Sequence, residues 1–559
     1  MPLIRNVLLN LSMLMTWLLI LSLITLLLPI IILVFVLRVS EDLLYKHWYG
    51  ENTTRLNAPD LAWPLIKDCV GQSGIIIGMM QLDGELSVAE CRKLLGERMV
   101  NKRKSPSPPN QTVNIGSNAE GFLFPKVRQY MKKGFVNYYW VDDLDFMIEN
   151  HVLEAEDSEM GDGSVVLRSD DDLQTLLNGS FSRAFRGASP WECLVVPKHV
   201  FENSVGVGND GSMKVKKKTV LVFRLNHAIG DGSSLAYFLA SSLGDYFPTA
   251  TSITTTPTRP EAVAKGRFGK FSESFSTWNT MVGLWYLPSV YASVMARGPD
   301  QNVLYSPTML NHKDKRVAWS RTPISLDKFK CVKNCIGGTV NDVFVGVLSK
   351  SLNDYFRIQN ASPENKYNKS MTILNAVNLR CGIPSGFDNQ ITALTVPFPV
   401  PPSYSSPSSC GKREENGKCE STLDHIHELK ATLDGMKARK EALGLIIGFH
   451  FIGFLLPACL LKSFFFKEIN KTTGNVTNLV GPGAPLTLGG DEAGGGHSVE
   501  LFSFWQPCIC NQGLGVSFCS YAGGVRLSAQ TDATVMRNPD IIIRLFENNF
   551  NQLLKDLNV

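Results

Sequence analysis

A stretch of mostly Leu and Ile, Val7–Leu37, stands near the start of the chain and carries no charged side chain before Arg38. A run of this length is typical of a membrane segment, because the apolar core of a signal peptide is much shorter. As one straight helix, about 31 residues would extend roughly 46 Å, whereas the hydrocarbon core of a bilayer is about 30 Å thick. A tilted single span or a monotopic hairpin bent near Pro29 would each absorb the excess, and we expect the single span. We therefore assign residues 1–45 to a membrane anchor.

The charges that flank this anchor are nearly balanced, since Arg5 precedes the apolar run and Arg38 and Lys46 follow it. The slightly more basic flank after the run favours a body on the cytosolic side. We expect a protein of the endoplasmic reticulum or plasma membrane that crosses the bilayer once near its N-terminus.

Length, net charge and cysteine spacing argue against several classes of function for the rest of the chain. Its 559 residues exceed one ordinary domain, and the length favours about two to four. A net charge of +4 does not provide the basic surface that nucleic-acid binding requires. The closest cysteine pairs, Cys331/Cys335 and Cys508/Cys510, lack a second pair at zinc spacing. We therefore expect no nucleic-acid partner, no metal ion, and mostly reduced thiols with at most a disulfide or two.

Strand-like and helix-like segments alternate after the anchor, which is typical of an α/β protein. A Thr/Pro-rich stretch at 249–260 interrupts the pattern and marks the crossover between two halves. We expect a first half at 46–248, a crossover segment at 249–310 and a second half at 311–559. The predicted strands are 74–82, 137–141, 219–225 and 371–379, the predicted helices are 87–98, 171–181 and 339–352, and the predicted loops are 101–118, 203–218 and 401–420.

A second apolar stretch at 442–461 is long enough to span a bilayer, but it contains His450, Pro457 and several glycines. We expect a lipid-facing or interfacial helix here, with a second membrane span as the alternative. An aromatic amphipathic segment, Trp278–Ala296, follows the crossover stretch.

The stretch N-H-A-I-G-D-G at 226–232 follows the predicted strand 219–225, whose apolar residues indicate burial on both faces. His227 would then lie in a loop at the end of this strand, and the hydroxyl residues from Ser233 onward suit the start of a helix. Asp231 would fix the loop, and Gly232 would adopt a positive φ that strains other residues. The spacing alone is more typical of a loop histidine than of a catalytic one.

The chain has no G-x-S-x-G elbow, no H-E-x-x-H motif and no convincing context for a catalytic cysteine, which excludes the common hydrolase and metalloprotease classes. If His227 is catalytic, its chemistry is that of a general base that acts on a hydroxyl group without a covalent enzyme intermediate.

N-H-A-I-G-D-G resembles the HHxxxDG motif of the CoA-dependent acyltransferase superfamily, and the wider chain resembles its wax ester synthase/diacylglycerol acyltransferase branch. The resemblance covers roughly residues 70–557. The further blocks, in the family's order, are N-Y-Y-W-V-D-D-L-D-F (137–146) with His151, S-P-W-E (189–192), G-G-T-V-N-D-V-F-V-G-V-L (337–348), A-V-N-L-R (376–380) with Asn389, and T-N-L-V-G-P-G-A-P-L-T-L-G-G (477–490).

This resemblance implies a chloramphenicol-acetyltransferase-like fold, with two similar α/β halves and a tunnel between them. His227 matches the second His of the motif, which is the general base of the family and would take the proton of an alcohol as its oxygen attacks the acyl-CoA thioester. Asp231 matches the structural Asp and Gly232 the turn Gly. Asn341 and Asp342 match the N-D pair of the family. Asn341 would then donate a hydrogen bond to the thioester oxyanion beside the tunnel, or the two residues would only pack within their helix. Arg380 is a candidate partner for Asp231.

The chain departs from the motif at Asn226, where the family usually has the first His. An amide can form hydrogen bonds locally but cannot titrate near neutral pH, so any role of that His that depends on charge is absent here.

We expect a membrane-bound O-acyltransferase that moves a fatty acyl group from acyl-CoA to a long-chain alcohol or to diacylglycerol, which would form a wax ester or a triacylglycerol. Its partners are then acyl-CoA, the lipid acceptor and membrane lipid, with no separate cofactor. The rival hypothesis is a non-catalytic lipid-binding membrane protein that keeps the fold, and Asn226 is its support. A third hypothesis, transfer of short acyl groups to a small hydroxylated metabolite, uses the same histidine but not the anchor.

Overall fold

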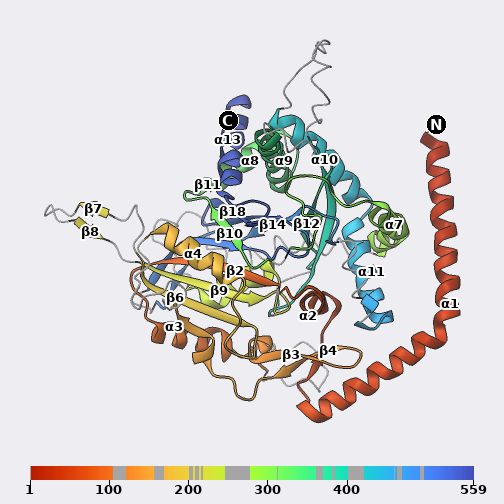
Figure 1. Ribbon diagram of the computed structural model, residues 1–559, viewed down its shortest axis with the longest axis horizontal. Coiled ribbons are helices and arrows are strands. Elements are labelled where there is room, and N and C mark those ends of the chain that lie inside the picture. Colours follow the sequence, from red (N-terminus) through yellow and green to blue (C-terminus); the bar gives the residue numbers. More distant parts are fainter. Residues whose placement is uncertain are drawn as a thin grey trace, which may run out of the picture.

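Two mixed β-sheets and the helices around them form the body of the protein, and one long helix extends along its side (Figure 1). The protein is described from a computed structural model. The described residues are 2–72, 74–104, 121–155, 169–199, 205–207, 213–215, 218–245, 277–310, 312–360, 369–380, 384, 386–400, 421–458, 460–461, 469–490 and 496–559.

The first, six-stranded sheet has the order β15-β16-β2-β9-β6-β5. Its strand β9 (Lys218–Asn226) lies between β2 (Ile75–Asp83) and β6 (Trp191–His199) and is antiparallel to both. All residues of β9 after the first are buried, which confirms the predicted buried strand. Its buried charged residue, Arg224, forms an ion pair with Glu192. The sheet is completed by β5 (Val152–Glu154), β15 (Thr487–Leu488) and β16 (His497–Trp505).

The second, seven-stranded sheet has the order β10-β18-β17-β14-β12-β13, and β11 also pairs with β18. Four helices share one hydrophobic core with it, and the stacked rings of Phe344 and Phe518, with centroids 4.3 Å apart, lie in that core. The strands are β10 (Lys315–Trp319), β11 (Ile324–Ser325), β12 (Met371–Asn378), β13 (Ile391–Phe398), β14 (Gly474–Val480), β17 (Leu514–Tyr521) and β18 (Gly524–Asp532), and the helices are α8 (Leu326–Cys335), α9 (Val340–Asn360), α10 (Thr422–Ala438) and α13 (Asp540–Asp556).

Strand β16 belongs to the second half of the chain but pairs with β2 of the first half. At its end, the buried Trp505 donates its indole N–H toward the carbonyl oxygens of Ala529 (3.2 Å) and Ala318 (3.3 Å), which lie on β18 and β10. One strand therefore ties the two sheets together. The division of the chain at residues 45, 248 and 310 stays a prediction.

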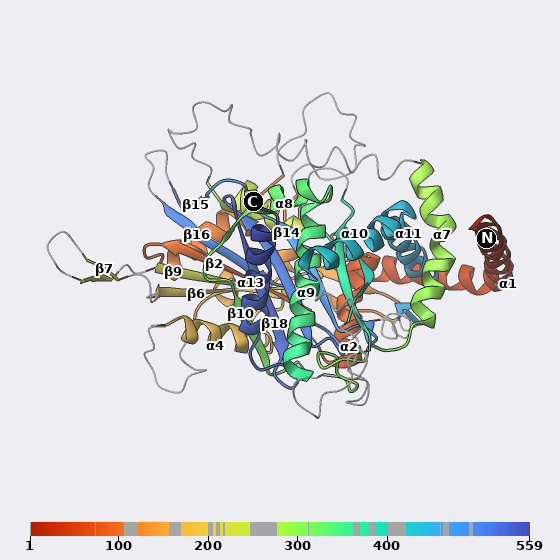
Figure 2. The ribbon, with the colours of Figure 1, turned by 90° about the horizontal axis from the view of Figure 1, so that it is seen from above.

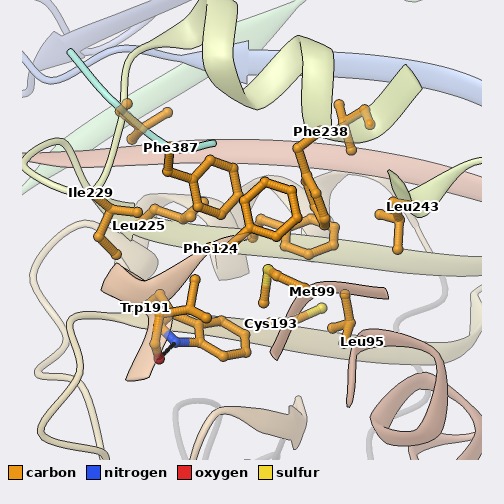
Figure 3. Packing of buried hydrophobic residues seen from close by; sticks show 14 of the residues in the cluster. Leu95, Met99, Phe124, Trp191, Cys193, Leu225, Ile229, Phe238, Leu243 and Phe387 are labelled. Carbon is orange, nitrogen blue, oxygen red and sulfur yellow. Dashed lines mark hydrogen bonds between the residues drawn. The ribbon is translucent and has the colours of Figure 1, made fainter. Parts of the chain in front are cut away.

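An aromatic core lies beside the end of β9 and contains residues from both halves (Figure 3). The ring of Phe124 lies 5.2 Å from that of Phe238 and 4.6 Å from that of Phe387, measured between centroids. Phe238 belongs to α5 (Gly232–Phe238), and Phe387 to the segment between β12 and β13. Aromatic pairs of this kind add about 0.5–1.5 kcal/mol each beyond burial. This packing holds the segment that follows β12 against the N-H-A-I-G-D-G loop.

The N-terminal helix α1 (Pro2–Tyr49) is continuous through Pro29, so the hairpin alternative is wrong. Pro29 removes one main-chain hydrogen bond, which favours a kink, and Figure 1 shows that α1 bends. By length and composition, α1 is the one helix among the described residues that could cross a membrane. The second apolar helix, α11 (Glu441–Leu455), is about 22 Å long at 1.5 Å per residue, too short for the second span that was our alternative.

The aromatic segment Trp278–Ala296 forms the helix α7 (Thr277–Ala296), which crosses α11 at closely packed glycines. A Cβ added at Gly444 would lie 2.5 Å from the carbonyl oxygen of Gly283. Glycines that let two helices approach so closely are typical of membrane-embedded pairs. Figures 1 and 2 both place α1, α7 and α11 on the same side of the molecule.

Most local predictions are confirmed, including the helix start at Ser87, where Ser87 and Glu90 form a reciprocal capping box. The predicted loop at 203–218 is wrong in part, because it contains a hairpin of β7 (Val205–Val207) and β8 (Met213–Val215). The crossover stretch 249–260 and the loop 401–420 lie outside the described residues, as do positions 105–118 of the loop at 101–118. The remaining elements are β1 (Thr54–Arg55), β3 (Gln129–Lys133), β4 (Tyr138–Asp142), α2 (Ala58–Val70), α3 (Val88–Leu95), α4 (Asp170–Ser180), the 3₁₀ turns Pro125–Arg128 and Ile148–Asn150, and the π-helical turns Gly96–Val100 and Leu239–Leu243.

Candidate active site

The N-H-A-I-G-D-G loop connects the end of β9 to the helix α5. Asp231 caps this helix, since its Oδ1 accepts the N–H of Ser234 at 2.9 Å. The prediction that hydroxyl residues cap the helix is therefore wrong, because the preceding carboxylate takes that place. The prediction of a positive φ at Gly232 is also wrong, since Gly232 is the first helical residue. A Cβ at Gly232 would lie 3.3 Å from the side chain of Leu479, so close packing is what favours glycine there.

Asp231 also forms a buried ion pair with Arg380 from the second half. The two nitrogen–oxygen distances are 3.2 and 3.0 Å, and the Asp231 carboxylate also accepts the N–H of Gln390 at 2.8 Å. Arg380 pairs with Asp388 as well. Removing these charges from water is costly, and the bidentate geometry with further hydrogen bonds offsets that cost. These bonds clamp the loop to Arg380 and Gln390.

His227 is buried, with 7% of its surface exposed, and its ring stacks on Trp63 of α2 at 4.2 Å and 15°. Its backbone N–H donates to the carbonyl oxygen of Gly74 at 2.7 Å. A Cβ at Gly74 would lie 2.1 Å from the Trp63 ring, so only glycine leaves room for this stack. Burial lowers the pKa of His227 below its ordinary value of 6.5. The neutral imidazole is therefore the main form at neutral pH.

Asn389 determines which nitrogen of His227 carries the proton. The Nδ2 of Asn389 donates to Asp60 Oδ1 (2.8 Å) and to the carbonyl oxygen of His227 (2.7 Å), which fixes the orientation of the amide. Its Oδ1 then faces Nδ1 of His227 at 3.1 Å. Because a carbonyl oxygen can only accept, Nδ1 must carry the proton, and Nε2 is left with a lone pair. This is the tautomer that a general base requires.

Asp60, in the first turn of α2, supports Asn389 from behind. Its Oδ2 accepts the ammonium of Lys126 at 2.6 Å and the indole N–H of Trp140 at 3.4 Å. Lys126 also donates to the carbonyl oxygen of Ala228 at 3.2 Å, inside the loop. A connected set of hydrogen bonds therefore runs from Lys126 through Asp60 and Asn389 to His227.

Asn226, which stands where the motif usually has its first His, forms a local hydrogen bond and carries no titratable group. Its Oδ1 accepts the backbone N–H of Ala228 at 2.9 Å and so shapes the turn that carries His227. Such side chain–backbone bonds are what short amide side chains commonly provide at the start of a turn.

The N-D pair of the second half occupies a different environment. Asp342 accepts the N–H of Thr339, its own N–H donates to the Thr339 hydroxyl, and Lys437 lies 3.3 Å from its carboxylate. It therefore caps the first turn of α9. Among the described residues, neither Asn341 nor Asp342 forms a hydrogen bond with the His227 cluster, and their roles at a tunnel stay predictions.

Sequence reasoning did not identify Trp63 or Asp60, and gave Asn389 only as part of a resembling block. Trp63 and Asp60 lie about 160 residues before His227 in the chain, within a helix whose sequence carries no catalytic motif. The one available signal was the polar Asp60 in the first turn of α2 after Asn57, and that pattern is typical of ordinary helix capping.

Comparison with known proteins finds similarity to one family in the second half of the chain and among its relatives. Residues 388–554 match the family model described as the WS/DGAT C-terminal domain. Wax ester synthase/diacylglycerol acyltransferase 11 of Arabidopsis thaliana is 26% identical over 359 residues, which are 57% of this chain and 66% of that protein. Wax ester synthase/diacylglycerol acyltransferase 5 of the same plant is 23% identical over 58% of this chain and 65% of its own length. The matched regions span just under two thirds of these relatives.

Two solved structures share the fold at low sequence identity. The wax ester synthase/diacylglycerol acyltransferase from Marinobacter aquaeolei VT8 has a TM-score of 0.52 and 13% identity, with 90% of this chain and 100% of that chain covered. The TRI3 trichothecene 15-O-acetyltransferase from Fusarium sporotrichioides has a TM-score of 0.51 and 12% identity, with 89% and 95% covered. The two-sheet α/β architecture therefore recurs in both.

Proposed function

We propose that this chain is a member of the wax ester synthase/diacylglycerol acyltransferase family and transfers a fatty acyl group from acyl-CoA to the hydroxyl of a long-chain alcohol or of diacylglycerol. The observation that carries the proposal is the hydrogen bond between Nδ1 of His227 and Oδ1 of Asn389. It leaves a lone pair on Nε2, in a loop where the two halves of the protein meet.

In this reaction, Nε2 of His227 takes the proton of the acceptor hydroxyl while the hydroxyl oxygen attacks the thioester carbonyl carbon. The tetrahedral intermediate then collapses, the carbon–sulfur bond breaks, and the CoA thiolate leaves with the proton from Nε2. The ester and free CoA are the products, and the histidine ends in its starting form. General-base help of this kind is typically worth about 10²–10⁴ in rate.

The lowered pKa of His227 fits this role. The base form is the neutral one, so activity is expected to hold at neutral pH and to decline only as the pH falls below 6.5. The acid limb of kcat/KM reports this pKa in the free enzyme.

The contact of Asn226 favours the enzyme over the non-catalytic alternative. Because Asn226 supports the loop through its Oδ1 and the backbone N–H of Ala228, the substitution leaves the arrangement of His227 and Asn389 complete. Both terminal nitrogens of Arg380 are already paired with carboxylates, which supports a clamping role for Arg380. A direct oxyanion contact from Asn341 remains part of the proposal.

The apolar helices support a lipid acceptor. Both proposed acceptors partition into membranes, and α1 could hold the protein in the bilayer of the endoplasmic reticulum or plasma membrane. Exposed apolar side chains on α7 and α11, including Trp278, Met281 and Phe454, would lie in the same interface.

The proposal is tested with the full-length protein in lipid nanodiscs and labelled long-chain acyl-CoA. Acceptors are a long-chain alcohol, diacylglycerol and a small hydroxylated metabolite, with acetyl-CoA as a short-chain control donor. We expect a labelled wax ester or triacylglycerol from the wild type, and about 10²–10⁴-fold less from His227→Ala. Tight binding of acyl-CoA without any ester would favour the non-catalytic alternative, and equal activity of His227→Ala would exclude the histidine base.

A further inference from the structure

Four polar or aromatic side chains follow one face of α1 just after its apolar run. Arg38, Glu41, Asp42 and Tyr45 have the i, i+3, i+4, i+7 spacing of a helix face, and we call them the clasp. Arg38, Glu41 and Tyr45 are buried, whereas Leu43 beside them is 65% exposed. The clasp therefore turns its polar side toward the body of the protein, which is the reverse of an ordinary lipid-facing helix.

Arg38 binds the end of α11. Its guanidinium donates to the carbonyl oxygen of Gly453 at 3.0 Å and also to those of Phe454 and Leu456. These are carbonyls of the last helical turn, which lack partners inside the helix and carry partial negative charge. A single buried cation thus satisfies the C-terminus of an apolar helix that otherwise has no basic residue in its last turn.

Glu41 binds the turn between β3 and β4. Its carboxylate accepts the N–H groups of Phe135, Val136 (3.1 Å) and Asn137 (3.1 Å), and the Asn137 amide at 2.8 Å. A Cβ added at Gly134 would lie 2.3 Å from Glu41, so only glycine leaves space for this carboxylate. Several N–H donors therefore converge on the buried carboxylate of Glu41 and stabilise its negative charge.

Asp42 and Tyr45 bind the neighbouring strand. Oδ1 of Asp42 accepts the hydroxyl of Tyr139 at 2.8 Å, and the ring of Tyr45 stacks on that of Tyr139 at 4.2 Å and 17°. Tyr139 lies on β4, between two residues that contact α2. Tyr138 donates to Asp68, and the indole N–H of Trp140 points to Oδ2 of Asp60.

The other arm of the clasp also reaches α2. Gly453, whose carbonyl oxygen Arg38 binds, packs against the first turn of α2, where an added Cβ would lie 3.0 Å from Cβ of Ala58. Two residues further along, Asp60 holds Asn389, and Trp63 of the same helix stacks on His227. The two contact routes, through β4 and through α11, therefore converge on the helix that supports the catalytic histidine.

We propose that the clasp positions His227: when Arg38 and Glu41 dock on α11 and on the β3–β4 turn, α2 is held where Asp60 and Trp63 fix the imidazole. The four clasp side chains are positioning residues, since they act through α2 and touch no substrate. This inference rests on the proposed function of His227 as the general base. It makes the anchor helix part of the catalytic architecture, beyond its role as an attachment to the membrane.

The test uses the full-length protein in lipid nanodiscs with Arg38→Met and Glu41→Gln. Lys46→Met is the matched control, because it removes one positive charge from the exposed side of the same helix. We expect kcat to fall by roughly 10-fold to 10²-fold in both clasp variants, with KM for acyl-CoA within about twofold of wild type, since misplacing a reacting group by about 1 Å has effects of this size. The control should match the wild type, and Arg38→Lys should recover part of the loss because an ammonium can still donate to the carbonyls.

A second readout does not require turnover. Hydrogen–deuterium exchange at the ring carbon of histidine, followed by mass spectrometry, measures the pKa of His227 directly. Burial lowers this pKa in the intact protein, so loosening α2 should admit water and move the pKa up toward 6.5 in the clasp variants. The acid limb of kcat/KM should move to higher pH by the same amount.

The two readouts separate the failure of this inference from that of the proposed function. If the folded clasp variants keep both the wild-type kcat and the wild-type pKa of His227, the inference is wrong and the proposed function stands. If the wild type forms no ester while the pKa of His227 still rises in the clasp variants, positioning by the clasp is supported and the acyltransfer proposal is wrong. Thermal unfolding of each variant identifies any that fail to fold, and Arg38→Lys then carries the comparison.

Discussion

His227 and His151 have similar surroundings but different prospects for catalysis. Both are buried, at 7% and 1% exposure, and burial lowers the pKa of both. Both stack on an indole ring, His227 on Trp63 at 4.2 Å and His151 on Trp191 at 4.8 Å. Neither burial, pKa nor aromatic contact distinguishes a general base from a histidine that only fills space.

The difference lies in the atoms that surround each ring. His151 is stacked between Phe146 and Trp191, and its Nδ1 bonds the backbone carbonyl oxygen of Trp191 at 2.8 Å. A Cβ added at Gly187 would lie 2.4 Å from Nε2 of His151, so backbone closes that side. His227 bonds a side chain from the other half of the protein instead. A side-chain partner from the second half, which holds the proton on Nδ1 of His227 and leaves the Nε2 lone pair, is the feature that distinguishes His227 from His151.

The largest expected effect comes from substituting the two histidines as a matched pair. His227→Ala should lower kcat by about 10²–10⁴-fold, because the general base is lost. His151→Ala should lower the free energy of unfolding by about 2–4 kcal/mol, because it leaves a cavity and an unpaired carbonyl, yet keep the kcat of the molecules that remain folded. Denaturant unfolding and active-site-normalised kinetics measure the two quantities. A strong loss of kcat in folded His151→Ala would contradict the assignment of a purely structural role to His151.

An intermediate effect is expected at Asn389, which gives His227 its tautomer. Asn389→Ala removes the acceptor for Nδ1–H and leaves buried partners unpaired, a loss of about 1–3 kcal/mol that corresponds to roughly 5-fold to 150-fold in kcat. Steady-state kinetics with saturating acyl-CoA measure this change. Asn389→Asp retains an oxygen acceptor for Nδ1 but places its second oxygen against the Asp60 carboxylate and the His227 carbonyl oxygen, so it should lose activity as well. Wild-type kcat in both variants would contradict the proposed role of the amide.

The smallest effect is expected at Asn226. In Asn226→His, one imidazole nitrogen can accept the Ala228 N–H that Oδ1 accepts now, so kcat should change by less than about fivefold, as for a single hydrogen bond of about 1 kcal/mol. The same kinetic assay applies. A rise in kcat of tenfold or more would show that the first histidine of the motif contributes charge that Asn226 cannot replace.

The elements around the site were largely predictable because they depend on short-range patterns. The strand before His227 is mostly apolar, and the helix after Ser87 has its capping box in the sequence. Local pattern was misleading at Gly232, where a turn-like Asp-Gly pair turned out to be a helix start capped by the aspartate. An Asp-Gly pair serves equally well in either structure, and only the chain that follows decides between them.

The groups that orient His227 were beyond local pattern. Asp60, Trp63 and Asn389 come from a helix before the first sheet and from a segment of the second half, so their meeting depends on the tertiary fold. The same holds for the clasp, since nothing in the sequence of α1 says that Glu41 enters the β3–β4 turn. Sequence resemblance indicated His227 as the candidate base, whereas the residues that orient its ring could be found only in the folded structure.

Strand β16 has a consequence for the order in which the protein is made. Its partner β2 leaves the ribosome early, whereas β16 follows roughly 400 residues later, so at about 5–20 residues per second the edge of β2 stays unpaired for on the order of 20–80 s. An open strand edge is a site for wrong pairing during that interval. The second half must therefore be synthesised, and β16 must pair with β2, before the open edge pairs with another chain. Early insertion of the N-terminal helix into a membrane would reduce this risk, because it would keep neighbouring nascent chains apart.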